Sequence, residues 1–185
     1  MTEPIKAVNA TIQLSDTLSI DGYMMPDGEF RAGIAGASVL LGHGKDWFNR
    51  LASKAPNKLK ALQEGGFTGR LQPVVIPRES GTRGASRAQT ISLKDLATLI
   101  TVEALAGNKR AIALQAAFTL EGLDSRFRDA FGVPQLSQVE KRRFFGLTYD
   151  QFLEALAENR TELEQLRLPG DDLYYTEEAD ADSNP

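Results

Sequence analysis

The strongest constraint on the fold is a change in hydrophobic period near residue 36. Before this point, Val8, Ala10, Ile12 and Leu14 alternate with polar residues, which is the period-2 pattern of a half-buried strand. After it, apolar residues recur three and four positions apart, as they do in amphipathic helices. The sequence therefore predicts an α+β fold, with a small N-terminal antiparallel β-sheet or hairpin followed by a mostly helical C-terminal part.

Turn dipeptides punctuate the β-rich segment. Asp21-Gly22 and Asp27-Gly28 both favour tight turns, so residues 23–31 are expected to form a short hairpin. Residues 71–76 have the composition of another strand. Because Pro73 has no backbone N–H to donate, this strand is expected at an edge of the sheet.

Capping residues mark the starts of the predicted helices. Ser92 with Asp95 matches a capping box, and Asn108 stands where one helix stops and the next begins. The same pattern at Ser137 and at Thr148 predicts two further helix starts. The earlier helices are expected over residues 37–41, 45–63 with a break at Pro56, 92–106, and from 109 to 120 or further.

Composition along the chain predicts four regions. They are a β-hairpin plus helix-turn-helix-like region over residues 1–77, a basic Gly/Ser-rich loop over 78–90, a helical region over 91–168, and a disordered acidic tail over 169–185. The tail is expected to compete in cis for the basic surface of the same chain, because it carries the opposite charge.

Charge is strongly segregated along the chain. Residues 45–110 hold twelve Lys/Arg against five Asp/Glu, a net charge of +7, although the whole chain has a formal net charge of −4. Residues 148–185 hold two Lys/Arg against eleven Asp/Glu, a net charge of −9. A basic middle containing the arginine-rich 78–87 loop suits double-stranded DNA, the alternative being a solvated surface loop without a role.

Residues 36–50 have the outline of a helix-turn-helix, namely a short apolar helix, a glycine turn and a second helix led by polar residues. In such a motif the second helix presents its first side chains to base edges in the major groove. An ordinary helical hairpin would have the same outline. Lys45, Asn49 and Arg50 are therefore expected to contact bases, and Lys54, Lys58, Arg78, Arg83 and Arg87 to contact phosphates.

Several function classes have no support in the residues. The chain has no Cys and a single His, His43, which excludes disulfides, thiolate metal sites and sites built from several imidazoles. His43 is expected to be a turn residue without an acid partner. We expect no metal, no cofactor, no membrane span and no enzymatic activity, and we expect a reducing cytoplasm as the location.

The residues assembled above resemble the KilA-N/Bro-N group of phage and large-virus DNA-binding modules, which occur in antirepressors. The resemblance is carried by residues 18–23, 37–50, 89–97 and 107–114, and it spans residues 18–132, with the 78–87 loop as an insertion. It implies a DNA-binding regulator of phage or mobile-element type, acting in transcription control without catalysis.

The alternative is a protein-interaction module that inhibits or sequesters a host or phage protein, such as a repressor, without binding DNA. Phe144, Phe145 and Tyr149 would then anchor the interface with that partner. Under either hypothesis the helix over residues 148–166 is expected to support a homo-oligomer.

Overall fold

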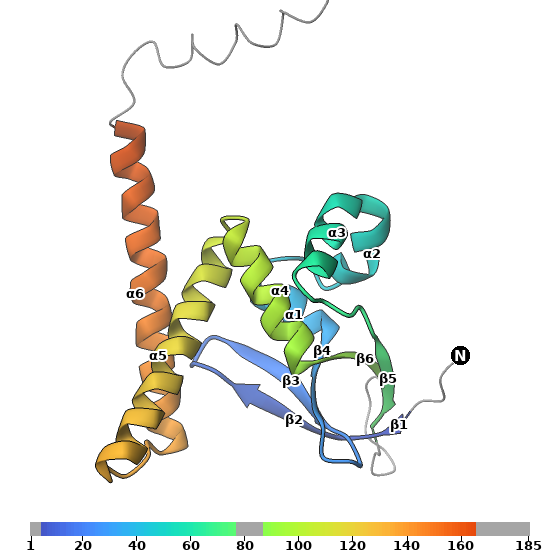
Figure 1. The fold of residues 1–185 in the computed structure, drawn as a ribbon, viewed down its shortest axis with the longest axis horizontal. Coiled ribbons are helices and arrows are strands. Elements are labelled where there is room, and N and C mark those ends of the chain that lie inside the picture. The colour runs from blue at the N-terminus through green and yellow to red at the C-terminus, as the bar shows by residue number, and fades with distance from the viewer. Residues whose placement is uncertain (1–4, 77–86, 166–185) are drawn as a thin grey trace, which may run out of the picture.

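The computed structural model describes residues 5–76 and 87–165 (Figure 1). The strands are β1 (Ile5–Lys6), β2 (Val8–Gln13), β3 (Ser19–Met24), β4 (Phe30–Gly33), β5 (Gln72–Val75) and β6 (Arg87–Ser92). The helices are α1 (Ile34–Leu40), α2 (Trp47–Lys54), α3 (Pro56–Glu64), α4 (Leu93–Leu105), α5 (Lys109–Phe131) and α6 (Gln138–Gln165). A mixed sheet at the N-terminal end followed by long helices confirms the predicted α+β fold.

One continuous stretch of chain supplies both ends of the sheet, whose strand order is β1-β5-β6-β4-β3-β2. Ile5 and Lys6 pair in parallel with β5, and from Val8 onward the same stretch pairs antiparallel with β3. Ala7 lies between the two pairings, is buried, and donates its N–H to the Val75 carbonyl at 3.0 Å. The sheet is therefore curved, so that its two end strands, β1 and β2, are adjacent at Ala7.

The prediction for the residues of β6 is wrong, because the sequence assigns them to the end of a loop and the start of a helical region. The strand pairs with both β4 and β5, and its Thr90 is fully buried. Arg31 on β4 fastens it: the guanidinium Nε donates to the Thr90 hydroxyl at 3.0 Å, and Nη2 donates to the Arg70 carbonyl at 3.1 Å. The first turn of α4 follows β6 directly, so β6 connects the sheet to the helices.

Two further expectations about the sheet are wrong. Asp21-Gly22 lies inside β3, not in a turn, and the residues between β2 and β3 make the reversal instead. The strand β5 lies between β1 and β6 and is not an edge strand. Pro73 is tolerated there because β1 pairs only with Val74 and Val75, so Pro73 lies outside the β1 pairing.

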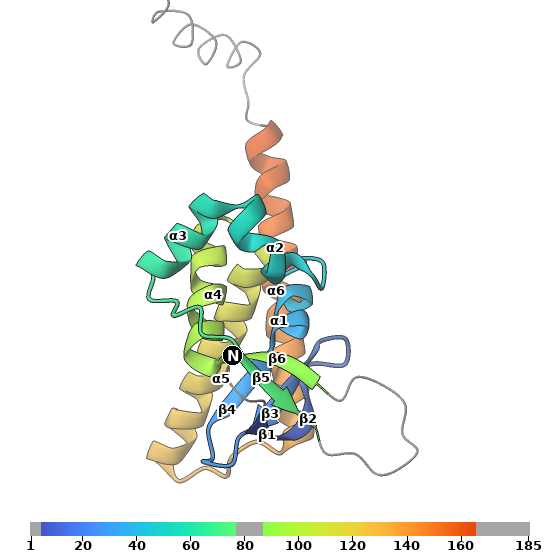
Figure 2. The ribbon, with the colours of Figure 1, turned by 90° about the vertical axis from the view of Figure 1, so that its right-hand side faces the viewer.

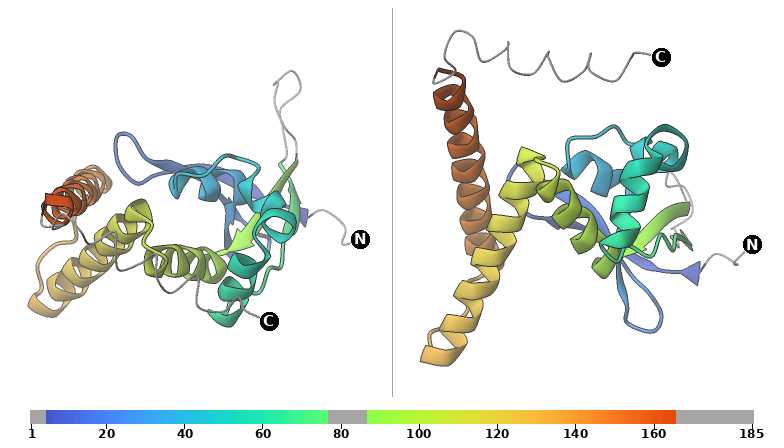
Figure 3. Two further views of the ribbon diagram at one scale, coloured as in Figure 1. Left: turned by 90° about the horizontal axis from the view of Figure 1, so that it is seen from above. Right: turned by 45° about the horizontal axis from the view of Figure 1, so that its top comes forward.

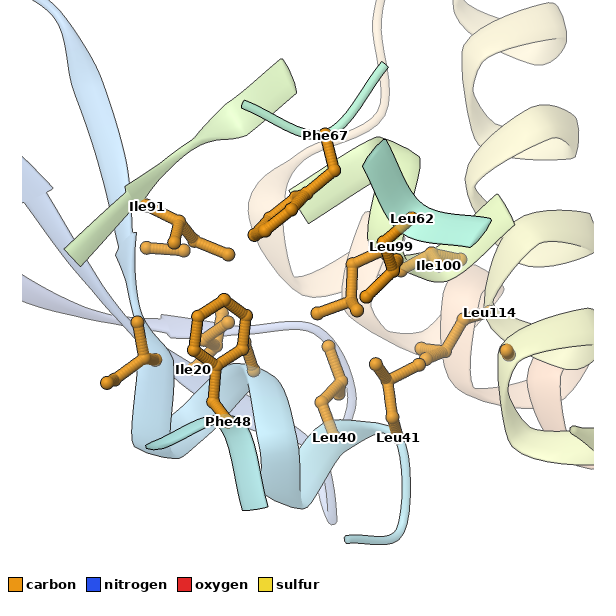
Figure 4. Close-up of a cluster of buried hydrophobic side chains, with 14 of the residues drawn as sticks. Ile20, Leu40, Leu41, Phe48, Leu62, Phe67, Ile91, Leu99, Ile100 and Leu114 are labelled. Atoms are coloured by element: carbon orange, nitrogen blue, oxygen red, sulfur yellow. The ribbon is translucent and has the colours of Figure 1, made fainter. Parts of the chain in front are cut away.

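The main core forms where α1 and α4 cover one face of the sheet (Figure 4). Ile20, Ala32 and Ile91 point from β3, β4 and β6 toward Leu40 of α1 and Leu99 of α4, and all five side chains are buried. Helices α2, α3 and α5 extend this cluster. Because strands and helices from both halves of the chain share it, the position of α2 is fixed by the same core as the sheet.

The predicted caps of three helices are confirmed. The Ser92 hydroxyl accepts from the Asp95 N–H, the Asn108 side chain accepts from two N–H groups at the start of α5, and Ser137 and Glu140 form a reciprocal pair before α6. The start predicted at Thr148 is wrong, because α6 runs through it without a break. The Thr148 hydroxyl instead donates to the Phe144 carbonyl one turn earlier.

Helices α5 and α6 pack side by side as a long hairpin next to the sheet (Figures 1 and 3). None of the helices between residues 5 and 165 has an apolar run long enough to span a bilayer. The acidic tail expected over residues 169–185 lies outside the described residues.

Candidate nucleic-acid interface

Two short helices joined by a tight turn form the candidate interface. Gly42 follows the end of α1 with a φ of 83°, a left-handed conformation that glycine adopts without strain. The His43 N–H then donates to the Ser38 carbonyl at 2.9 Å, which closes the turn, and α2 begins at Trp47. The two helices and the glycine turn expected over residues 36–50 are therefore present.

The inner face of α2 is held by aromatic and aliphatic contacts. Phe48 and Leu51 are buried in the main core, and the Phe48 ring meets the Phe67 ring edge-on at 5.6 Å between centroids. Trp47 is half-buried and stacks on the His43 imidazole, with 4.1 Å between centroids. These contacts fix how α2 is rotated about its axis, and so they determine which residues face solvent.

The outer face of α2 carries two residues that the sequence predicts as base contacts, Asn49 and Arg50, and one predicted phosphate contact, Lys54. The third predicted base contact, Lys45, precedes the helix, and all four residues are exposed. Arg50 lies 3.8 Å from the Asp46 carboxylate, but both side chains are mostly in solvent, so this pair is weak and leaves the guanidinium available. A shallow hollow of about 260 Å³ follows the helix, with Arg50 and Lys54 on its lining.

Below α2, a buried carboxylate joins four separate elements. Glu103 of α4 is almost fully buried, and its Oε2 lies 3.0 Å from the His43 Nε2 in the α1–α2 turn. The Lys58 ammonium of α3 lies 2.5 Å from its Oε1. The Asn108 amide at the start of α5 donates to Oε2 at 2.9 Å and to the Leu41 carbonyl at 3.0 Å.

This cluster supports the turn and α2 from behind. The Lys58 ammonium also lies 5.4 Å from the centre of the Trp47 ring, so the charge meets the aromatic face of α2 as well as the carboxylate. Burial raises the pKa of Glu103, but hydrogen bonds from Lys58, Asn108 and His43 outweigh it and hold the pKa below the ordinary glutamate value. Glu103 is therefore charged at neutral pH and compensated by its partners.

The cluster is not predicted from the sequence. The prediction that His43 has no acid partner is wrong, because Glu103, sixty residues further along the chain, contacts its ring. A signal was present, since Glu103 falls on the helical stripe of Leu96, Leu99 and Ile100, where a charged residue needs a buried partner.

The predicted phosphate contacts fall into three groups. Lys54 and Arg87 are exposed. The ammonium of Lys58 is paired with Glu103, so Lys58 belongs to the supporting cluster and we do not include it in the DNA-contact set. Arg78 and Arg83 lie outside the described residues. Figure 2 shows the α1–α2 turn and the end of the β5–β6 hairpin, where Arg87 begins β6, on the same side of the molecule.

The predicted protein-interaction residues do not form a surface patch, which is a further correction. Phe145 and Tyr149 are buried between α6 and the rest of the core, and Phe144 is half-buried. The Phe145 ring meets the Phe118 ring of α5 at 4.8 Å, so it holds the two helices of the hairpin together.

Comparison with known proteins finds no family model, no curated protein and no solved structure that matches this chain. Among residues 5–76 and 87–165, no three His, Asp or Glu side chains come together as a possible metal site. The candidate interface presents the exposed cations of Arg50 and Lys54 and the amide of Asn49 on a helix whose inner face is packed in the core.

Proposed function

We propose that this protein is a DNA-binding regulator of phage or mobile-element type, which reads double-stranded DNA with the outer face of α2. The observation that carries the proposal is the division of α2 into two faces. Its inner face is fixed by Phe48, Leu51 and the cluster around Glu103, and its outer face presents Asn49 and Arg50 to solvent, with Lys45 exposed just before the helix. A rigid helix with polar, cationic side chains exposed at its start suits the major groove.

Each exposed residue has a distinct proposed role. Asn49 is suited to bidentate contact with adenine and Arg50 to bidentate contact with guanine, each worth about 1–3 kcal/mol of discrimination. Lys45 stands just before the helix, where it would reach a neighbouring base or phosphate. Lys54, Arg87 and, from the sequence, Arg78 and Arg83 would neutralise phosphates and fix the register.

The regulatory setting rests on the resemblance to KilA-N/Bro-N modules and on the charge of the chain. The basic middle of the sequence provides sequence-independent affinity, and the α2 face would add selectivity. We place this activity in a reducing cytoplasm, since the chain carries no Cys. The proposal includes no catalytic step.

The test is binding to a labelled random duplex across roughly 50–200 mM salt, where the logarithm of affinity falls linearly with the logarithm of salt concentration. Wild type is expected to show a slope of several released counterions. Arg83→Ala/Arg87→Ala is expected to reduce the slope by about 2, because each phosphate contact contributes about one. Asn49→Ala/Arg50→Ala is expected to relax the preference among sequences selected from a random pool.

The matched control is Arg126→Ala, which removes one exposed cation from α5 at a distance from α2. It should leave both slope and sequence preference unchanged. Absence of binding at the lowest salt, or an effect of Arg126→Ala equal to that of the α2 variant, would contradict the proposal.

A second candidate function, binding of a protein partner without DNA, is favoured by an apolar hollow of about 480 Å³ on the sheet. The hollow lies between strands β2 to β4 and side chains of α1, α4 and α5, and Val8, Ile12, Met24 and Phe30 are exposed there. Phe30→Glu would abolish such an interaction and leave DNA affinity intact, so this single variant separates the two functions.

A further inference from the structure

The C-terminal half of α5 carries an apolar stripe that the described residues cover only in part. Residues buried on this helix stop at Ala117, although the helix continues to Phe131. Beyond that point Leu120, Leu123, Phe127 and Phe131 recur at spacings of three and four, so they share one side of the helix. They are 40%, 47%, 62% and 78% exposed, respectively.

From these observations we propose that the stripe on α5 is a dimerisation surface, and that its occupant is the same stripe of a second copy of this chain. A two-fold arrangement pairs one surface with itself, and an apolar helix stripe with this spacing is able to pack against its own copy. The inference does not depend on DNA binding.

The exposed area of the stripe approaches what a stable dimer needs. The four stripe side chains leave roughly 450 Å² accessible, judged from the size of fully exposed apolar side chains. A stable interface buries about 800 Å² per partner, of which about 65% is apolar in homodimers. The stripe therefore supplies most of the apolar share of one such interface.

The end of the hairpin is also held rigid, although it lies beyond the core. The Arg128 guanidinium donates to Asp124 at 2.6 Å and to the Pro134 carbonyl at 3.1 Å. The Gln135 amide donates to the Ser125 carbonyl and to the Asp129 carboxylate, which ties the α5–α6 connection back onto α5. A surface ordered in advance loses less entropy when it binds, which favours association.

The position of the stripe fits a dimer in which both α2 helices remain free. In Figure 1 the far end of the α5–α6 hairpin extends past the sheet at the lower left, and α2 lies at the upper right. Pairing through the hairpin ends therefore leaves the outer face of α2 open in each copy.

The experiment is the molar mass of the full chain in solution, measured by light scattering across micromolar concentrations. Wild type is expected at twice the 20.2 kDa chain mass. Leu123→Glu/Phe127→Glu is expected at the mass of one chain, with unchanged circular dichroism because neither side chain belongs to the buried core. The matched control is Leu105→Glu, which places the same charge at a residue that is 84% exposed outside the stripe and should remain dimeric.

A cross-linking measurement tests the dimer without introducing the negative charges of the Glu substitutions. The chain has no Cys, so Phe127→Cys introduces a single thiol, and oxidation is expected to link two copies in the wild-type background. Leu105→Cys should not cross-link. A monomeric wild type, a dimer that survives Leu123→Glu/Phe127→Glu, or a dimer lost only with Phe30→Glu would each overturn the proposal.

Discussion

At the residue scale, Glu103 is a buried charge that connects α4 to the α1–α2 turn, to α3 and to the start of α5. Its carboxylate is a buried negative charge on α4, and removing that charge would leave the Lys58 ammonium without a counter-charge. The Lys58 ammonium, the His43 imidazole and the Asn108 amide all converge on its two oxygens. The orientation of the α1–α2 turn therefore depends on a residue far from the exposed face of α2.

Replacing Glu103 by Gln is expected to lower stability by about 1.5–3 kcal/mol, because the change removes the charge that compensates the partly buried Lys58 ammonium. For a chain of this length, the loss corresponds to a fall in Tm of roughly 5–10 °C. Thermal unfolding followed by circular dichroism measures it. Glu64→Gln is the matched control, since Glu64 pairs with Lys60 at 3.8 Å in solvent and should change Tm little.

The same carboxylate predicts a direction for the pH dependence. The pKa of Glu103 is lower in the folded chain than its ordinary value of about 4.3, so the folded state favours the charged form. Its stabilising contribution is present above that ordinary value and is lost as pH falls through the lower, folded-state pKa. The Tm difference between wild type and Glu103→Gln should therefore shrink below about pH 4. A difference that stays constant down to pH 3 would contradict this assignment.

At the element scale, the sequence predicts elements well where one local pattern decides the outcome. The caps at Ser92, Asn108 and Ser137 are set by residues within one helical turn, and all three are present. The strand β6 depends instead on pairing with β4 and β5, which are distant in sequence, and its own residues have the composition of a loop. Thr148 has the residues of a cap, but packing of α6 along α5 overrides that local signal.

Gly22 shows why the Asp21-Gly22 pair sits in a strand. A Cβ at this position would lie 2.8 Å from the Cγ1 of Ile12 on the neighbouring strand, so the absence of a side chain lets β2 and β3 approach. Gly22→Ala is expected to lower stability by about 1–3 kcal/mol through this overpacking. The double variant Ile12→Ala/Gly22→Ala should recover most of the loss, because it removes the atom that clashes.

The control for this prediction is Gly122→Ala on α5. A Cβ there meets no atom within 4 Å, so the change should raise stability through the better helix propensity of alanine. Urea unfolding measures these effects in five chains, namely wild type, Gly22→Ala, Ile12→Ala, the double variant and Gly122→Ala. Equal effects of Gly22→Ala with and without Ile12→Ala would mean that the cross-strand contact is not the cause.

At the scale of the whole molecule, the chain has a basic helix face at one end and an apolar stripe at the other. The exposed residues of α2 could be predicted from sequence, because a short amphipathic helix after a glycine turn fixes its outer face. Glu103 stands out in the sequence as a charge on an apolar stripe, but its partners His43 and Lys58 lie far away along the chain and could not be inferred from it. The α5 stripe could not be predicted either, because tertiary packing ends the burial on α5 at Ala117. Phe145 and Tyr149 were misassigned for the same reason, since apolar residues on a helix do not reveal what covers them.

If both proposals hold, dimerisation through α5 sets how steeply DNA affinity depends on salt. A dimer brings two α2 faces to one duplex and releases about twice as many counterions as a single chain. Leu123→Glu/Phe127→Glu should therefore give about half the wild-type slope on a duplex of roughly 40 base pairs, long enough for two half-sites one helical turn apart. Leu105→Glu should keep the wild-type slope. Equal slopes for wild type and the monomeric variant would show that the two copies do not engage DNA together, even if each proposal is correct alone.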